Sequence, residues 1–319
     1  MPITQPVRVG KTDLFVPQMG LGTAPIANLY DDISDEQAIE TIQACLEAGL
    51  NFFDTAPLYG LGLAERRLSM ALQGVPRDDY IIATKIGRLV EPDDRIRFDF
   101  SRDGVLRCID ESLTRLKMDR VDIVHIHEPD GEAADEPGFR ESFPILADLR
   151  EQGVIKAVGA GMNRWHTVID FVREADFDCF LLAGRYTLLE QDSLEFLSLC
   201  EKKGISLFLA GVMNSGILAT GAGPTAKYNY RVAPQAIQDK ARQIQIICDR
   251  FDVSLPTAAL QFALAHPATH ALVVGAATPD EVKANAQAFQ TDIPTEFWTE
   301  LQAQGILHKN APLPKGKDE

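Results

Sequence analysis

The sequence lacks the features that would tie it to nucleic acid or to a membrane. Its 31 basic side chains are outnumbered by 46 acidic ones, the formal net charge is −15, and no long basic block is present. This balance argues against nucleic acids and anionic membranes as partners. No apolar stretch reaches the ~20 residues that a spanning helix needs, and the first residues lack the apolar core of a signal peptide. We therefore expect a cytoplasmic protein.

Cysteine is scarce, and nothing in its spacing indicates a disulfide or a metal site. The five cysteines are odd in number, lack C-x-x-C spacing and fall mostly within apolar or helical patterns, at positions 45, 108, 179, 200 and 248. Such residues are usually reduced and buried. Four of the six histidines, at positions 166, 266, 270 and 308, also have no ligand-like spacing. We expect no metal.

Complete glycine-rich phosphate motifs are also missing. Gly20-Leu-Gly22 and Gly159-Ala-Gly161 begin like G-x-G-x-x-G, but neither has the third glycine, and there is no P-loop and no G-x-S-x-G. A nucleotide, if one binds, is therefore not held by a Rossmann crossover.

Short apolar runs alternate with amphipathic stretches along the chain. Continuous apolar runs are typical of parallel strands covered by helices. Eight runs are predicted strands: Gln18–Leu21, Asn51–Asp54, Tyr80–Thr84, Ile123–His127, Ile155–Gly159, Cys179–Ala183, Ser206–Ala210 and Leu272–Val274. The predicted helices between them are Asp35–Ala48, Arg102–Leu116, Ser142–Glu151, Thr167–Glu174, Leu194–Lys202, Pro234–Phe251 and Leu255–His266.

Eight alternating strands favour a (β/α)8 TIM barrel over a doubly wound sheet. Two β-prone runs within Val7–Val16 predict an N-terminal β-hairpin, and the chain is long enough for extra C-terminal helices. Barrels of this length commonly form one unit, so we expect a single domain over residues 1–319.

Four chemically active residues lie at or just beyond three predicted strand ends. They are Asp54, Tyr59, Lys85 and His127. Barrel active sites lie at the carboxyl ends of the strands, so a carboxylate, a phenol, an ammonium and an imidazole would meet there. Asp54 and Lys85 could instead form only an interior salt bridge. If the site is catalytic, Lys85 favours the phenolate of Tyr59, and Asp54 fixes Lys85.

The second histidine of this strand needs separate treatment. His125 and His127 point to the same side of the strand because they are two residues apart. His127 is nearer the carboxyl end and is the predicted active-site residue, whereas His125 is predicted to lie one layer deeper.

With these residues assembled, the chain resembles the aldo-keto reductases over nearly its whole length. The matching segments occur in the family's order: GLGT (20–23), NFFDTAPLYG (51–60), ATK (83–85), VDIVHIHEPD (121–130), VGAGMN (158–163) and VVGAATPDEVKAN (273–285). The resemblance implies an extended nicotinamide cofactor at the mouth of the barrel. It also implies that Tyr59 is the general acid/base and that Asp54, Lys85 and His127 complete a tetrad.

The resemblance further implies which residues contact the cofactor. At two positions this chain departs from the family's pattern. The implied contacts are Thr23, Asn163, Gly211, Met213, Ser215, Gly275, Ala276, Glu281 and Asn285. The family's carboxamide-binding glutamine is replaced by Ala183, and its ring-stacking tyrosine by Ala210. NADP-specific relatives place basic side chains where Gly275 and Glu281 align. We therefore expect NAD, with NADP disfavoured by the like charge of Glu281. Alternatively, Glu281 is only a helix-start glutamate.

The segments AGMN, LLAGRYTLLEQ and AGVMNSGIL resemble those of the NAD-linked sugar dehydrogenase branch, which acts on L-fucose, L-galactose and D-threo-aldoses, with a pyridoxal 4-dehydrogenase as a close neighbour. The expected reaction is oxidation of a cyclic hemiacetal to a lactone, with a sugar first and pyridoxal, giving 4-pyridoxolactone, second. Substrate contacts are expected from Tyr30, Trp165 and the loop 128–139. The alternatives are an NADPH-dependent aldehyde reductase and a channel-associated regulatory subunit. We expect a monomer or a small homo-oligomer.

Overall fold

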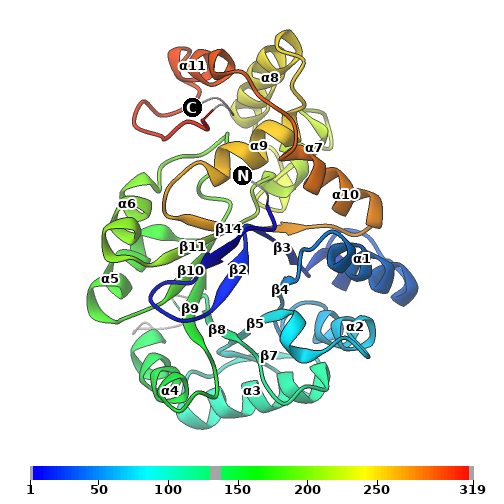
Figure 1. The fold of residues 1–319 in the computed structure, drawn as a ribbon, viewed down its shortest axis with the longest axis vertical. Coiled ribbons are helices and arrows are strands. Elements are labelled where there is room, and N and C mark those ends of the chain that lie inside the picture. The colour runs from blue at the N-terminus through cyan, green and yellow to red at the C-terminus, as the bar shows by residue number, and fades with distance from the viewer. Residues whose placement is uncertain (1–2, 130–137, 316–319) are drawn as a thin grey trace.

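Eight parallel strands close into a barrel with helices around it in the computed structural model, which describes residues 3–129 and 138–315 (Figure 1). Around the barrel the strands pair in the order β10-β11-β14-β3-β4-β5-β8-β9. Their bounds are β3 (Met19–Gly22), β4 (Phe52–Asp54), β5 (Ile81–Ile86), β8 (Ile123–His127), β9 (Ala157–Met162), β10 (Cys179–Ala183), β11 (Ser206–Ala210) and β14 (Thr269–Gly275). The predicted (β/α)8 barrel is confirmed.

Helices cover the outside of this barrel. Those next to the strands are α1 (Asp35–Glu47), α2 (Leu63–Ala71), α3 (Arg102–Leu116), α4 (Phe139–Glu151), α5 (Trp165–Glu174), α6 (Leu194–Lys203), α9 (Leu255–Leu264) and α10 (Pro279–Ala288). The others are the short α7 (Ile217–Thr220) and the pair α8 (Gln235–Arg250) and α11 (Thr295–Ala303), which lies outside α9 in Figure 1. Ser34 caps the amino end of α1, since its Oγ accepts from the Gln37 amide at 3.2 Å. No helix within the described ranges is both long and apolar enough to cross a membrane.

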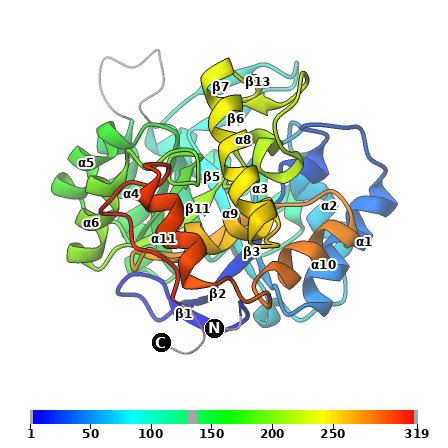
Figure 2. The same cartoon turned by 90° about the horizontal axis from the view of Figure 1, so that it is seen from above.

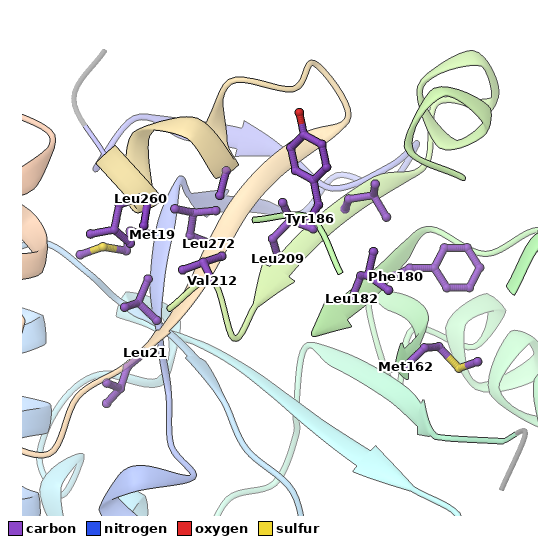
Figure 3. Close-up of a cluster of buried hydrophobic side chains, with 14 of the residues drawn as sticks. Met19, Leu21, Met162, Phe180, Leu182, Tyr186, Leu209, Val212, Leu260 and Leu272 are labelled. Carbon is purple, nitrogen blue, oxygen red and sulfur yellow. The ribbon is translucent and has the colours of Figure 1, made fainter. Parts of the chain in front are cut away.

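The strands separate two hydrophobic cores. Outward side chains such as Leu182 and Leu209 pack beneath the helices, and Figure 3 shows part of this outer core. Their sequence neighbours Leu181 and Phe208 point into the barrel and form an inner core. Burial on both faces explains why these strands are continuous apolar runs rather than alternating ones.

Three antiparallel hairpins lie at the two ends of the barrel. The predicted N-terminal hairpin is β1 (Pro6–Arg8) with β2 (Phe15–Pro17), and its Val9, Leu14 and Val16 join the inner core. The hairpin β6 (Arg88–Val90) with β7 (Ile96–Phe98), and the hairpin β12 (Lys227–Tyr228) with β13 (Arg231–Val232), lie at the opposite end (Figure 2). The sequence predicted neither of these two.

The structure differs from the predicted elements in several places, including β9 and α2. The strand predicted at Ile155–Gly159 is Ala157–Met162 instead, because Gly159 and Gly161 are strand interior rather than a strand end. Helix α2 was not predicted. It buries Glu65 and Arg67, which interrupt the apolar face that marks a helix in a sequence. The five cysteines are free and buried.

Candidate active site

Three neighbouring strands bring the predicted tetrad together. Asp54 ends β4, His127 ends β8, and Lys85 is the penultimate residue of β5, which lies between them. Tyr59 follows in the turn after β4, where its amide donates to the carbonyl of Ala56 at 3.1 Å. The order of the strands therefore places all four side chains at the carboxyl end of the barrel.

Lys85 is the centre of this group. Its Nζ donates to Asp54 Oδ2 at 2.6 Å and to the carbonyl of Thr55 at 2.9 Å. The same Nζ lies 4.8 Å from the centre of the Tyr59 ring. The rings of Tyr59 and His127 meet edge to face, with centroids 6.2 Å apart. Lys85 is only 1% exposed, so these neighbours replace water around its charge.

Burial opposes both charges of the ion pair. It raises the pKa of Asp54, while the charge and hydrogen bond of Lys85 act in the opposite direction. Burial alone would lower the pKa of Lys85, but Asp54 and Tyr59 outweigh it, and the pKa is raised. The ammonium is therefore held in its charged form beneath Tyr59.

The prediction that Lys85 favours the phenolate of Tyr59 is correct for the contribution of Lys85, but that contribution does not decide the net pKa. The charge of Lys85 does act to lower the pKa of Tyr59, but burial of the phenol is the larger effect, and the net pKa is raised. Sequence alone could not weigh these effects, because the degree of burial comes from the closed fold.

His127 is a neutral imidazole in this site. Burial first, and then the charge of Lys85, lower its pKa well below the ordinary value. Its Nδ1 has no hydrogen-bond partner among the described residues. A neutral imidazole can offer one N–H and accept at the other nitrogen, which suits the orientation of a substrate oxygen.

His125 lies one layer deeper, as predicted. It is fully buried and pairs in register with Lys85 on one side and with Gly159 on the other. A Cβ on Gly159 would lie 2.3 Å from His125 Nδ1, so the glycine makes room for the imidazole ring. On the same strand, a Cβ on Gly161 would lie 3.4 Å from Lys85 Cε, which is an ordinary contact distance.

Small residues and an irregular turn at the mouth fit an extended nicotinamide cofactor. Ala183, Ala210 and Gly275 end three adjacent strands, so these three strand ends carry no bulky side chain. After β11, Asn214, Ser215 and Gly216 have φ values of 46°, 59° and 101°. Successive left-handed residues of this kind let the backbone approach a phosphate closely. The carboxamide of Asn163 is exposed at the same rim.

The other predicted cofactor residues differ in what they offer. The hydroxyl of Thr23 already donates to the Asp54 carbonyl at 2.9 Å, and Ala276 is buried. Met213 packs partly against the outer core. Asn285 lines a small cavity behind β3 together with Met19 and Leu21.

Gly275 and Glu281 have clear structural constraints. A Cβ on Gly275 would lie 2.8 Å from Pro25 Cγ, so a basic side chain cannot stand there without moving the proline. Glu281 lies in the first turn of α10, where its Oε2 accepts from the Ala277 amide at 2.7 Å. Glu281 therefore does act as a helix-start glutamate, and its carboxylate lies at the amino end of α10.

A polar network at the rim was missed by the sequence reasoning. The side-chain amide of Asn163 donates to the carboxylate of Glu128, and the backbone carbonyl of Asn163 accepts from Arg185 Nε at 2.9 Å. Arg185 also pairs with Glu190 at 2.8 Å. Arg185 could have indicated this network, because it is a charged residue two positions beyond a predicted buried strand. It also lies in the segment where the family's glutamine is missing.

The predicted substrate residues lie on different segments, Tyr30 after β3 and Trp165 after β9. Tyr30 is 43% exposed near the mouth, with its ring stacked against Tyr230. Trp165 begins α5 and stacks on His166, partly packed against the outer core. Of the loop 128–139, residues 130–137 lie outside the described residues. No group of three or more His, Cys, Asp or Glu in the described parts of the chain could hold a metal ion.

Comparison with known proteins gives consistent matches. The sequence profile described as "Aldo/keto reductase family" matches residues 18–305. A pyridoxal 4-dehydrogenase from Microbacterium luteolum is 37% identical, over 94% of this chain and 97% of that protein. A D-threo-aldose 1-dehydrogenase from Pseudomonas sp is 36% identical, over 92% and 95%. The solved holo form of an aldo-keto reductase from Bacillus halodurans superposes with a TM-score of 0.79 at 26% identity, over 99% and 98%.

Proposed function

This chain belongs to the aldo/keto reductase family, and on that basis we propose that it is an NAD-dependent dehydrogenase that oxidises a cyclic hemiacetal to its lactone. One observation carries the proposal. Lys85, in a buried ion pair with Asp54, has its Nζ 4.8 Å from the centre of the Tyr59 ring, and this ring meets the neutral His127 edge to face. Such a group can accept the proton of a hydroxyl while the oxygen is held in place.

The proposed roles follow from the contacts. The nicotinamide supplies hydride transfer when bound. His127 orients the hydroxyl oxygen of the substrate, and Tyr59 takes its proton. The raised pKa of Tyr59 means that the phenol is protonated near neutrality, so oxidation should become faster as the pH rises. Lys85 stabilises the phenolate form that accepts the proton, and Asp54 keeps Lys85 in position.

An aldose is the first proposed substrate and pyridoxal the second. Both react as a cyclic hemiacetal with one hydroxyl on the carbon that loses hydride, so the tetrad serves them equally. The aldose dehydrogenase and the pyridoxal dehydrogenase match this chain at 36% and 37% identity, which supports keeping both.

Two features support NAD over NADP. In the aligned position, Glu281 occupies the amino end of α10, where the 2′-phosphate of NADP would otherwise find a favourable helix terminus. Asp280 adds a second carboxylate in the same turn. At the other aligned position, Gly275 cannot readily be replaced by a basic side chain.

The decisive test is a matrix of initial rates. NAD and NADP are each assayed with L-fucose, L-galactose, D-arabinose and pyridoxal, and the product is checked to be a lactone. We expect NAD to be preferred and at least one hemiacetal to be oxidised. Faster turnover of open-chain aldehydes with NADPH would favour the reductase alternative. Absence of turnover with every pair would favour the regulatory-subunit alternative.

A further inference from the structure

The turn of the β12–β13 hairpin carries an unexpected tyrosine. Lys227 pairs with Val232 and Tyr228 with Arg231, so Asn229 and Tyr230 are the two central residues of the turn. Their φ values are 49° and 63°. Two-residue turns with both φ values positive strongly favour Asn-Gly. A bulky residue in this region is a backbone outlier. The strain indicates that the side chain of Tyr230 has a role that offsets the backbone cost.

Neighbouring loops hold the strained turn in place. The amide of Tyr230 donates to Ser215 Oγ at 3.0 Å, and Arg185 Nη2 donates to Asn229 Oδ1 at 3.1 Å. The hydroxyl of Tyr228 donates to Glu190, which also pairs with Arg185. The hairpin is therefore fixed to the loops that follow β10 and β11, at the carboxyl end of the barrel.

This position brings Tyr230 to the reacting end of the molecule. Its ring lies 6.5 Å from that of Tyr30, centroid to centroid, and the two planes differ by 18°. Both rings are accessible, Tyr230 at 64% and Tyr30 at 43%. Lys227 of the same hairpin lies 6.0 Å from the centre of the Tyr30 ring.

The electrostatics of these tyrosines agree with this position of Tyr230. Burial raises the pKa of Tyr30 to about 12, and the phenol of Tyr230 contributes to this rise. For Tyr59, whose pKa is raised mainly by burial, Tyr230 also adds a smaller upward contribution. Together with the hydrogen bonds that fix the turn to the loops after β10 and β11, this places Tyr230 at the same end of the barrel as Tyr59.

We propose that Tyr30 and Tyr230 form an aromatic wall at the mouth of the site, and that Tyr230 determines specificity for ring-shaped hemiacetals over open-chain aldehydes. An aromatic face offers a flat apolar surface that a pyranose or pyridine ring can cover and a short aldehyde cannot. The inference rests on the proposed function and extends it to a residue that the tetrad does not include.

The variant Tyr230→Gly removes this side chain without disturbing the conformation of the turn. Glycine is the preferred residue at this position of the turn, so the melting temperature should stay unchanged or rise. We expect KM for L-galactose and pyridoxal to rise about tenfold, with kcat within about twofold, because the ring contact contributes to binding. KM for propanal, reduced with NADH, should stay the same. Tyr230→Phe should behave like the natural protein, as should the control Val232→Ala, which alters another exposed apolar residue of the hairpin.

Two results would overturn the inference. One is an unchanged KM for both ring substrates in Tyr230→Gly, and the other is an equal rise in KM for propanal. If the natural protein oxidises no hemiacetal, the proposed function fails independently. Calorimetric binding of pyridoxal to the NAD-loaded protein then tests the wall, and equal Kd values for the natural protein and Tyr230→Gly would refute it. If only pyridoxal or only the sugar shows the KM rise, the wall is confirmed and the ring that it accepts is identified.

Discussion

Replacing Lys85 by methionine should damage stability and catalysis through two different neighbours. The stability effect arises from Asp54, whose carboxylate would lose its partner at 2.6 Å in a site where it is 2% exposed. Removal of one partner of a buried ion pair typically costs about 3–5 kcal/mol. Urea denaturation of Lys85→Met should show a loss of this order in the free energy of unfolding.

The catalytic effect arises from Tyr59. Lys85 Nζ lies 4.8 Å from the centre of its ring. With an effective dielectric constant of about 20, a unit charge at that distance stabilises the phenolate by about 3 kcal/mol. The rate of hemiacetal oxidation with NAD should therefore fall by about two orders of magnitude.

The double variant Asp54→Asn/Lys85→Met separates these effects. It removes both charges, so most of the lost stability should return, whereas the oxidation rate should stay low because Tyr59 still lacks its cation. If Lys85→Met remains within about tenfold of the natural rate at pH 8, the electrostatic role given to Lys85 is wrong. If the double variant is no more stable than the single one, the loss does not come from an unpaired Asp54.

Three further predictions concern single residues. Tyr59→Phe should fold normally and bind NAD with unchanged Kd while kcat falls about 10²- to 10⁴-fold; near-full activity would exclude Tyr59 as the acid/base. Glu281→Arg should raise the ratio of kcat/KM for NADP over NAD about tenfold or more, and the neutral control Glu281→Gln should raise it less; no change in the arginine variant would remove the support for NAD selectivity. Burial lowers the pKa of His266 to about 4, below its unfolded value, so the unfolded state binds more protons between pH 6.5 and 4 and stability is lost as the pH falls through this window. The loss should be about 2 kcal/mol at pH 5 and should be absent in His266→Gln, measured by denaturation at pH 7 and pH 5; the same loss in the variant would assign it to other groups.

Much of the barrel could be predicted because its strands are buried on both faces. Leu181 and Phe208 point inward while Leu182 and Leu209 point outward, so both faces contribute apolar residues to the same short run. The strand β9 was misplaced for a related reason. Its Gly159 makes room for the ring of His125, and this demand comes from another strand.

The features that could not be predicted from the sequence depend on contacts between distant segments. In α2, Glu65 is buried because it accepts from Thr84 at 2.8 Å and from Arg115 at 2.6 Å, partners that its own segment does not reveal. The β12–β13 turn lacks the glycine that marks such turns, so nothing local indicated a hairpin there. The strand-end positions of the tetrad could be inferred from sequence, but the net pKa of Tyr59 could not, because it depends on how completely the fold excludes water.

The five buried cysteines can report local opening of the folded chain. They lie on α1, α3, β10, α6 and α8, spread around the barrel and its outer helix layer. Burial raises the pKa of each thiol, so the reactive thiolate is rare while the fold is closed. A thiol reagent followed by peptide mass analysis would record, for each of these elements, how often it separates from the barrel. Local stability could thus be mapped along the chain with its own cysteines, without introducing new ones.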